Sequence, residues 1–353
     1  MKNHMYKPAS SARISMAVCL LAGSLLFASC HHGDKIPDVS GIDVKTVEIQ
    51  RFDTAFFALD SNNIPAGLYR LVQEYPWFTP DFVSNILGAG PLNDTNTLAL
   101  QATRGFLVSY RHLKDSLEMK YPDLSPLAKD LTRAFRFFKY YFPKYTLPPK
   151  VVAYIGPIDG PGVAITTYSL AIGLQAYGGR NFSPYLSGQG QDMYPGYISR
   201  RFEPEYIVPN CMTALAQDLF PDSSENRPLI EQMVIKGKYW WLAGKLLPGT
   251  PDSLRTGFTA AQLKWCADNE RSIYNFFLQN TDLYTIDPEI IKNYIGDAPK
   301  TQGMPDVAPG NIGSWVGWHI VQKYVEDHSD ITPMALMRTS ARQIFDEAKY
   351  KPR

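Results

Sequence analysis

The feature that most constrains the fold of this chain is a change of hydrophobic period near its middle. Residues 127–142 repeat apolar side chains at helical spacing, and helical patterns return from Pro204 onward. Between them lie β-branched or apolar runs separated by glycine and proline, which are typical of strands. These runs are residues 151–155, 162–168 and 170–177. The sequence therefore predicts an α+β fold that is predominantly helical and contains one small sheet.

Two further stretches bear on the surroundings of this sheet. Residues 44–50 alternate like an additional strand, and residues 94–120 read as one long helical stretch. Residues 178–196 are rich in glycine, tyrosine, proline and serine, so we expect a loop that overhangs a cleft. No internal repeat and no second domain boundary follow, which predicts a single domain over residues 44–353.

Local signals indicate where several helices begin and how two of them pack. Ser125 before Pro126 predicts an N-cap, and Thr259 with Gln262 predicts a capping box. Asp287-Pro288 and Thr332-Pro333 repeat the first of these patterns. Gly313 and Gly317 lie one helical turn apart and predict a close approach of another backbone, because glycine inside a helix otherwise costs about 1 kcal/mol.

The N-terminus predicts an exported lipoprotein. Basic residues precede the apolar run 14–27, which is too short to span a membrane, so residues 1–29 read as a signal peptide. Cys30 directly after Ala-Ser resembles a bacterial lipobox, which implies a diacylglycerol thioether and an acylated (palmitate-type) amino terminus. The alternative is ordinary secretion with an incidental cysteine. Residues 30–43 would form a polar tether.

The same region bears on location and on the cysteines. Only Asp34 is acidic after Cys30, whereas surface export of some lipoproteins uses an acidic cluster there, so the periplasmic face of the outer membrane is favoured. Of the remaining cysteines, Cys211 and Cys266 could form one disulfide in an oxidising periplasm or remain buried free thiols.

No complete catalytic signature is present. Zinc peptidases need two histidines one turn apart with a glutamate between them, and the domain beyond the tether has only His112, His319 and His328 and no HExxH. There is no G-x-S-x-G and no phosphate-binding loop. A net charge of +1 and the lack of a basic, aromatic-interleaved run argue against nucleic acid. We therefore expect no enzyme activity, catalytic residue, metal or cofactor.

The best polar constellation lies at the junction of the sheet and the following helix. It comprises Tyr197, Arg200, Arg201, Glu203 and Glu205. One interpretation is an ion-pair network that fixes the helix entrance, with both acids favoured by the helix dipole. The other makes an arginine a fork for a carboxylate of a partner or a peptide end. The sequence leaves both open.

Several strings together resemble the gliding motility lipoprotein GldB family of Bacteroidetes. They are YISRRFEPEYIVPN from Tyr197, GKYWWLAGKLLPGTPDSL from Gly237, FTAAQLKWCADNERSIYNFF from Phe258, GNIGSWVGWHIVQKYV from Gly310, and YKP at residues 350–352. The resemblance implies an envelope lipoprotein associated with gliding machinery, and a zincin-like (metallopeptidase-related) fold that has lost its metal ligands, a pseudo-peptidase.

These observations together give a functional hypothesis with two alternatives. We expect a lipoprotein tethered to a membrane through Cys30, acting on other envelope proteins as a non-catalytic binding or assembly factor. One alternative is a periplasmic peptidase or other hydrolase whose ligands come from distant segments. The other is a binder of a glycan or small ligand, which would show aromatic side chains lining an open cleft.

Overall fold

The computed structural model describes residues 36–92 and 97–352. Val39–Arg353 form one compact unit. Residues 39–43, which the sequence assigned to the tether, therefore belong to this unit, and the Val39 side chain is buried. The predicted signal peptide and Cys30 lie outside the described residues. No helix in the described part of the chain is both long and apolar enough to cross a membrane.

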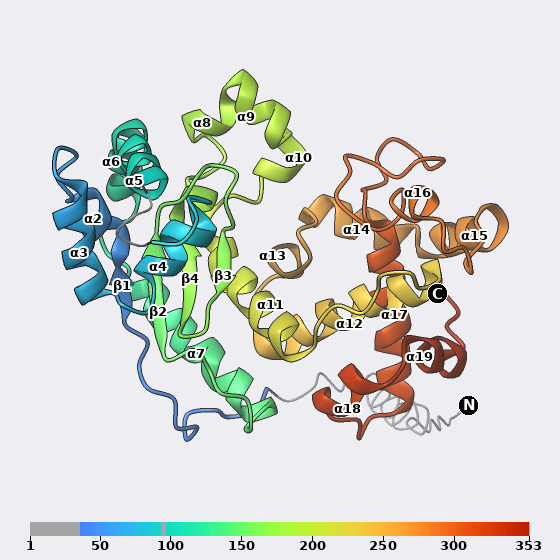
Figure 1. Ribbon diagram of the computed structural model, residues 1–353. Coiled ribbons are helices and arrows are strands. Elements are labelled where there is room, and N and C mark those ends of the chain that lie inside the picture. The colour runs from blue at the N-terminus through green and yellow to red at the C-terminus, as the bar shows by residue number, and fades with distance from the viewer. Residues whose placement is uncertain (1–35, 93–96, 353) are drawn as a thin grey trace, which may run out of the picture. The chain divides into compact units, whose positions relative to one another are not determined.

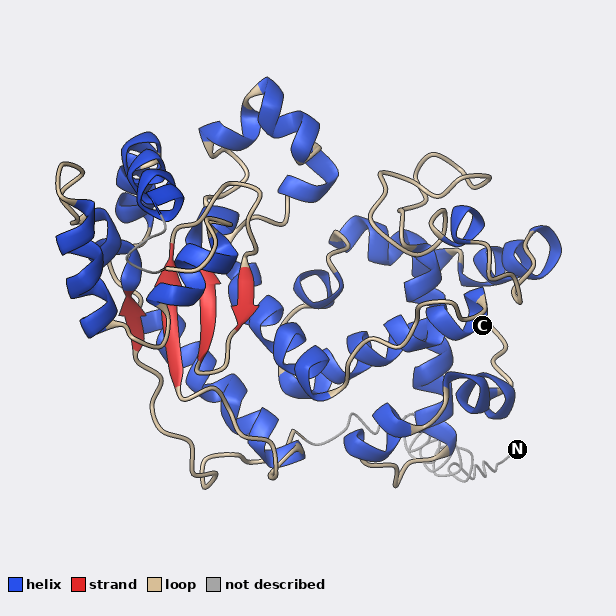
Figure 2. Ribbon diagram, viewed as in Figure 1, coloured by secondary structure: helices blue, strands red, loops and turns tan. Residues whose placement is uncertain are grey.

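One four-stranded mixed sheet stands among the helices of the described residues (Figure 2). Its strand order is β1-β2-β4-β3, with β1, β2 and β4 parallel and β3 antiparallel to β4. The strands are β1 (Ile49–Arg51), β2 (Lys150–Tyr154), β3 (Val163–Ile165) and β4 (Ser169–Gly173). β4 is buried along its whole length, as expected of a strand covered on both faces. The predicted α+β class with a small sheet is confirmed.

The strand predicted over residues 44–50 is too long. Its partner β2 begins only at Lys150, directly after Pro148 and Pro149, and proline has no N–H to donate to a ladder. Residues 44–48 therefore run past the sheet, and the Val47 N–H donates instead to the Thr132 hydroxyl at 2.9 Å.

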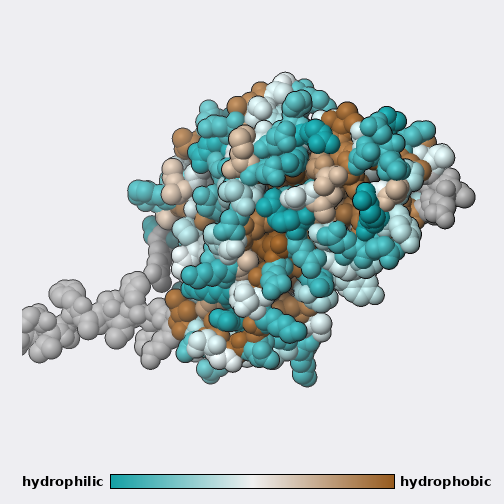
Figure 3. Space-filling view, turned by 90° about the vertical axis from the view of Figure 1, so that its left-hand side faces the viewer, coloured by the Kyte–Doolittle hydropathy of each residue, from teal (hydrophilic) through white to brown (hydrophobic). Residues whose placement is uncertain are grey.

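The first helices and the sheet share an aromatic core. Phe52 packs edge-on against Phe78 and Phe82, with ring centroids 4.8 and 4.9 Å apart, and α2 lies against β2. These elements are α2 (Phe52–Phe57), α3 (Ile64–Glu74), α4 (Thr79–Asp81), the π-helical turn η1 (Phe82–Ile86), α5 (Thr97–Ser109), α6 (Arg111–Lys120) and α7 (Ser125–Tyr141). The outer face near α2 and α3 mixes hydrophilic residues with small hydrophobic areas (Figure 3).

Two helix predictions in this half need correction. The single stretch predicted over residues 94–120 is two helices, which meet at Tyr110. Ser125 is the first residue of α7 rather than its N-cap, which is Leu124. The backbone N–H and the hydroxyl of Ser125 both donate to Asp123, at 2.8 and 2.7 Å. The Asp123 carboxylate, and not the Ser125 hydroxyl, therefore accepts from a backbone N–H at the start of α7.

The segment after β4 is more helical than its composition indicates. The predicted loop over residues 178–196 contains short helices, because Ser187 accepts from the Gly190 N–H and caps one of them. The elements are the 3-10 turns η2 (Leu174–Tyr177) and η3 (Pro204–Tyr206) and the helices α8 (Ser183–Leu186), α9 (Gly188–Met193), α10 (Gly196–Ser199) and α11 (Ile207–Leu219). Pro209 lies in the first turn of α11, where it needs no partner for its nitrogen.

The C-terminal half is helical throughout, apart from its connections (Figure 1). The Thr259–Gln262 capping box and the side-chain caps of Asp287 and Thr332 are confirmed. The helices are α12 (Leu229–Leu246), α13 (Asp252–Thr256), α14 (Ala260–Asp268), α15 (Glu270–Asn280), α16 (Pro288–Ile291), α17 (Ile312–Asp327), α18 (Pro333–Arg338) and α19 (Ala341–Ala348).

The predicted close approach at the glycines is the crossing of α12 and α17. A methyl group added at Gly317 would lie 1.8 Å from the Met233 carbonyl oxygen, and one at Gly237 would lie 2.3 Å from the Gly317 carbonyl carbon. The two backbones therefore touch, which only glycine permits. Close packing thus compensates for the low helix propensity of glycine.

Cys211 and Cys266 are both buried free thiols, so the structure contradicts the disulfide alternative. Burial raises the pKa of both thiols, that of Cys266 to about 12. Both side chains therefore stay protonated and pack as small apolar groups.

Candidate functional site

A cleft of about 850 Å³ lies between α11, α12 and the start of α17, and we call it the central cleft. α11 contributes Asn210, Thr213 and Gln217, which are three and four residues apart and so share one face of the helix. The opposite face of α11 carries buried Cys211 and Leu215. The helix that follows the sheet therefore presents amides and a hydroxyl to the cleft.

The facing wall is a stripe of α12 at similar spacing. Its cleft-lining residues are Gln232, Lys236, Tyr239, Trp240 and Ala243. The Lys236 ammonium pairs with Asp222, and the Tyr239 hydroxyl donates to the Phe220 carbonyl oxygen at 2.5 Å. These contacts fix both side chains at the wall, so the cleft has a defined polar lining before anything binds.

Arg201 lies at the rim of the central cleft and pairs with a distant carboxylate. Its guanidinium donates to Asp297 at 2.6 Å. Its methylene stem rests on Gly257, which ends α13 at a φ of +76°, and a Cβ there would make a tight contact of 3.1 Å with Arg201 Cδ. The left-handed glycine thus seats the arginine.

Arg200 lies in a small recess beside the central cleft, lined also by Tyr197, Gln262 and Gly310. Burial, and then the charge of Arg201, lower the pKa of Arg200. Its one side-chain hydrogen bond that the described residues supply is long, 3.4 Å to the Gln262 side-chain oxygen, and none of them places a carboxylate within ion-pair distance. A partly buried guanidinium without an ion-pair partner has the donor geometry to bind a carboxylate.

Glu203 turns away from the paired arginines. It accepts from the Arg180 backbone and side chain at 3.0 and 2.8 Å, and Lys120 lies 4.0 Å away. Burial alone would raise the pKa of Glu203, but the hydrogen bonds from Arg180 and the charge of Lys120 hold it below its ordinary value. This acid fixes the start of the segment containing α8–α10.

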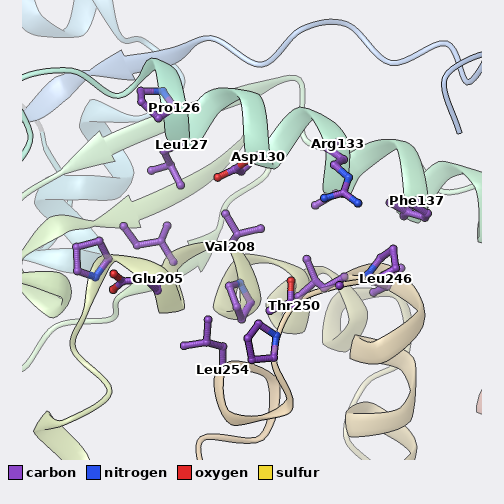
Figure 4. A pocket seen from close by; sticks show the side chains of 18 of the residues that line it. Pro126, Leu127, Asp130, Arg133, Phe137, Glu205, Val208, Leu246, Thr250 and Leu254 are labelled. Carbon is purple, nitrogen blue, oxygen red and sulfur yellow. The ribbon is translucent and has the colours of Figure 1, made fainter. Parts of the chain in front are cut away.

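Glu205 belongs to a separate groove (Figure 4). The groove encloses about 510 Å³ between α7 and the connection from α12 to α13, where Glu205 and Val208 lie across from Asp130 and Arg133. Most of its other lining is leucine and proline. Arg200, Arg201, Glu203 and Glu205 therefore do not form the single network that one interpretation of the sequence offered.

Arg255 of α13 also lines the central cleft. Its guanidinium pairs with Asp252 and lies against Gly244 of α12, while its Nε is buried without a hydrogen-bond partner. The polar stripe of α11, in contrast, follows a three- and four-residue spacing that the sequence contains. No signal in the sequence marks Arg255.

Of the five cations around the cleft and its recess, Arg200 alone has no carboxylate partner among the described residues. Arg201 pairs with Asp297, Lys236 with Asp222, Arg255 with Asp252, and Lys292 with Glu289. No cleft-lining residue comes from residues 178–196, so the predicted overhang of that segment is wrong for this cleft; Tyr197 and Arg200 at its exit reach the recess instead.

The histidines stay apart from the central cleft. His319 stacks on Trp315 at 4.0 Å between ring centroids and lies 3.3 Å from Glu270. Burial lowers the pKa of His319 and outweighs the opposing pull of Glu270. Within residues 36–92 and 97–352, no group of three or more His, Cys, Asp or Glu side chains is placed to hold a metal ion.

The fold and the cleft define an α+β protein with a preformed polar cleft between α11, α12 and the start of α17. The family model described as gliding motility protein GldB matches residues 32–352, and the chain belongs to this family of lipoproteins related to gliding motility. No curated protein and no solved structure matches the chain. The relation to zincin-like peptidases therefore stays a prediction.

Proposed function

We propose that this protein is tethered to a membrane by lipid on Cys30 and acts in the cell envelope as a non-catalytic binding or assembly factor for other envelope proteins. The family assignment supports the lipoprotein character and the link to gliding motility. The periplasmic face of the outer membrane is the location that we propose, because only one acid follows Cys30.

The observation that carries the binding role is the lack of an ion-pair partner for Arg200 beside the polar central cleft. An arginine fork binds a carboxylate through two parallel hydrogen bonds, and partial burial strengthens such a contact. We propose that a partner protein inserts a segment with aspartate or glutamate side chains, or a chain end, so that one carboxylate reaches Arg200. The amides and hydroxyls of α11 then supply hydrogen bonds along the segment.

The test is recovery of partners from crosslinked envelopes that contain lipidated protein. Arg200→Ala is compared with Arg104→Ala, which removes an exposed arginine from α5, far along the chain. We expect the first substitution to weaken partner recovery by about tenfold, equivalent to roughly 1.4 kcal/mol, and the second to leave it unchanged. Equal recovery with both variants would refute the role of the arginine.

A second candidate function is glycan binding, favoured by one specific observation. Tyr206, Tyr239 and Trp240 all line the central cleft, and aromatic faces with nearby amides are suited to sugar rings. Trp240→Ala would then abolish binding to a glycan array while Arg200→Ala would not. The reverse pattern with an acidic peptide would support the proposed partner segment.

A further inference from the structure

The lipid anchor that we propose would hold one end of the domain close to the membrane. Only eight residues lie between Cys30 and Val39, where the compact unit begins. Fully extended, the nine steps from Cys30 to Val39 reach about 30 Å at ~3.3–3.6 Å per residue. The part of the surface near Val39 therefore stays within about 30 Å of the lipidated cysteine at the bilayer.

The parallel strands define which end of the sheet this is. Residues 39–48 lead into the amino end of β1, and the parallel pairing of β1, β2 and β4 gathers their amino ends at one edge. The segment with α8–α10 follows the carboxyl end of β4. Figure 1 shows it at the opposite end of the sheet from residues 39–48.

The edge with the amino ends carries a group of cations that we call the amino-end surface. Its members are Lys45, Arg136, Lys139, Lys144 and Lys150. Lys45, Lys139 and Lys150 line one groove of about 770 Å³. Arg136 lines a neighbouring groove, and Glu48 lines both grooves. Lys144 follows α7 on the exposed turn that leads back to this groove.

These cations have no carboxylate partner in the described part of the chain, unlike many others on the molecule. Lys139 donates to the carbonyl oxygens of Pro143 and Tyr145, at 2.6 and 2.8 Å, which leaves its charge uncompensated. The Arg136 Nε is buried without a partner. In contrast, Lys264 pairs with Asp268 four residues away on α14.

The acids nearby do not cancel this charge. Asp43 and Glu48 line the same groove, and Asp218 accepts from the Tyr145 hydroxyl at 2.6 Å. In the neighbouring groove Asp123 and Asp130 add two carboxylates while Lys129 and Arg133 add two cations, so cations still exceed carboxylates at this edge. Tyr168, at the turn between β3 and β4, is 54% exposed, and its carbonyl oxygen accepts from the Lys150 N–H at 3.2 Å. Exposed tyrosine beside lysine is the composition that favours a membrane–water interface.

We propose that the amino-end surface rests against anionic phospholipid headgroups and orients the tethered domain. This inference rests on the lipid anchoring proposed above. So few cations would bind a membrane only weakly by themselves, but an anchor keeps them within reach of it. The carboxyl end of the sheet, with the segment before Arg200 and Arg201, then points away from the bilayer toward partners.

Lysine labelling of the lipidated full chain tests the orientation. The protein is reconstituted in phosphatidylcholine vesicles with or without phosphatidylglycerol, and acetylation of each lysine is followed by mass spectrometry. We expect phosphatidylglycerol to slow labelling of Lys45, Lys144 and Lys150 several-fold and to leave the exposed Lys264 and Lys292 unchanged. Salt should reverse the protection, because it screens the charges.

A charge-reversal variant, Lys45→Glu with Lys144→Glu and Lys150→Glu, alters only exposed side chains. In the unaltered chain phosphatidylglycerol should also slow labelling of Lys129, which lines the same groove as Arg136, and the variant should remain anchored yet lose this effect. Equal labelling of both lysine sets in the two vesicle types would overturn the proposal. Protection that appears in whole envelopes but not in phosphatidylglycerol vesicles would assign the surface to a protein and overturn it equally.

The anchor is measured separately from the orientation. Lipid on Cys30 is detected by mass, and a chain whose residues 1–30 are replaced by a signal peptide that is cleaved without lipidation should appear in the soluble fraction. If the wild-type chain carries no lipid, the proposed tethering is refuted. If it is lipidated and held by vesicles but shows no selective protection, only the orientation is refuted.

Discussion

The helix α12 shows two contrasting uses of one element. On one side, Gly237 lets α12 touch the backbone of α17 with no side chain between them. On another side, Gln232, Lys236 and Tyr239 line the central cleft. The first region is dry, tightly packed and intolerant of added atoms, whereas the second is polar and open. The close crossing with α17 therefore holds α12 in place as the wall against which a partner would bind.

The largest effect should come from breaking the crossing. Gly317→Ala places a methyl group 1.8 Å from the Met233 carbonyl oxygen, so the helices must separate. We expect the free energy of unfolding to fall by at least about 3 kcal/mol in chemical denaturation. Gly105→Ala is the matched control, because nothing lies within 4 Å of its added methyl and α5 gains helix propensity. That control should gain about 0.5–1 kcal/mol. A small loss for Gly317→Ala would show that the crossing is looser than described.

A buried cation on α12 tests the dry side by another route. Lys238 is 7% exposed and donates to the Thr339 carbonyl oxygen at 2.9 Å. Burial, and then the charge of Arg227, lower the pKa of Lys238 from 10.5 to about 8. The unfolded chain therefore binds this proton more tightly than the folded chain does. The free energy of unfolding should rise as the pH increases from about 8 to 10.5, and below about pH 8 it should stay constant at its lower value.

Lys238→Met removes the free-energy cost of burying the lysine charge and keeps a side chain of similar length. The free energy of unfolding at pH 7 should rise by on the order of 2 kcal/mol, and the rise in stability at alkaline pH should disappear. Lys236→Met, on the cleft side, is the control and should change stability by less than about 1 kcal/mol, since its ion pair is partly exposed. Unchanged alkaline dependence in Lys238→Met would contradict this assignment.

The sequence predicted those regions whose cause is local. The period change near residue 151 gave the sheet, the pair Gly313 and Gly317 gave the helix crossing, and Thr259 with Gln262 gave a cap. Each depends on residues within a few positions of one another. The short helices after β4 were missed because their composition is that of a loop, and their order depends on caps and packing.

The candidate site was harder to predict because its contacts are distant in sequence. Arg201 pairs with Asp297 across 96 positions, and Arg180 with Glu203 across 23. The spacing in the sequence suggested the nearby acids Glu203 and Glu205 as ion-pair partners of the two arginines, but these acids point to different surfaces. Which arginine keeps an unmatched charge depends on this tertiary arrangement, and no local pattern records it.

A smaller effect should come from the cap that supports the recess. The Thr259 hydroxyl accepts from the Gln262 N–H, and the Gln262 side-chain oxygen accepts from the Thr259 N–H. The same oxygen faces Arg200. Thr259→Ala should lower the free energy of unfolding by about 1 kcal/mol in urea denaturation. Ser116→Ala, on the exposed face of α6, should change it by less than about 0.5 kcal/mol. Equal losses would remove the cap from the account.

The smallest expected effect concerns the cleft rim. Asp297→Asn removes the partner of Arg201 in an ion pair that is partly exposed, so stability should change by less than about 1 kcal/mol. The freed guanidinium should strengthen binding of an aspartate-rich peptide about threefold, as judged by calorimetry. Weaker peptide binding would show that Asp297 itself contacts the ligand. Asp268→Asn is the control, because its ion-pair partner Lys264 does not line the cleft.

The central claim, that a partner occupies the cleft between α11 and α12, is tested most directly by site-specific photocrosslinking in living cells. A photoreactive residue replaces Gln217, which lines the cleft, or Arg342, which lies on the exposed face of α19. The account predicts a discrete adduct with an envelope protein from position 217 only, and its loss on Arg200→Ala. Equal adducts from both positions, or an adduct that persists without Arg200, would contradict it.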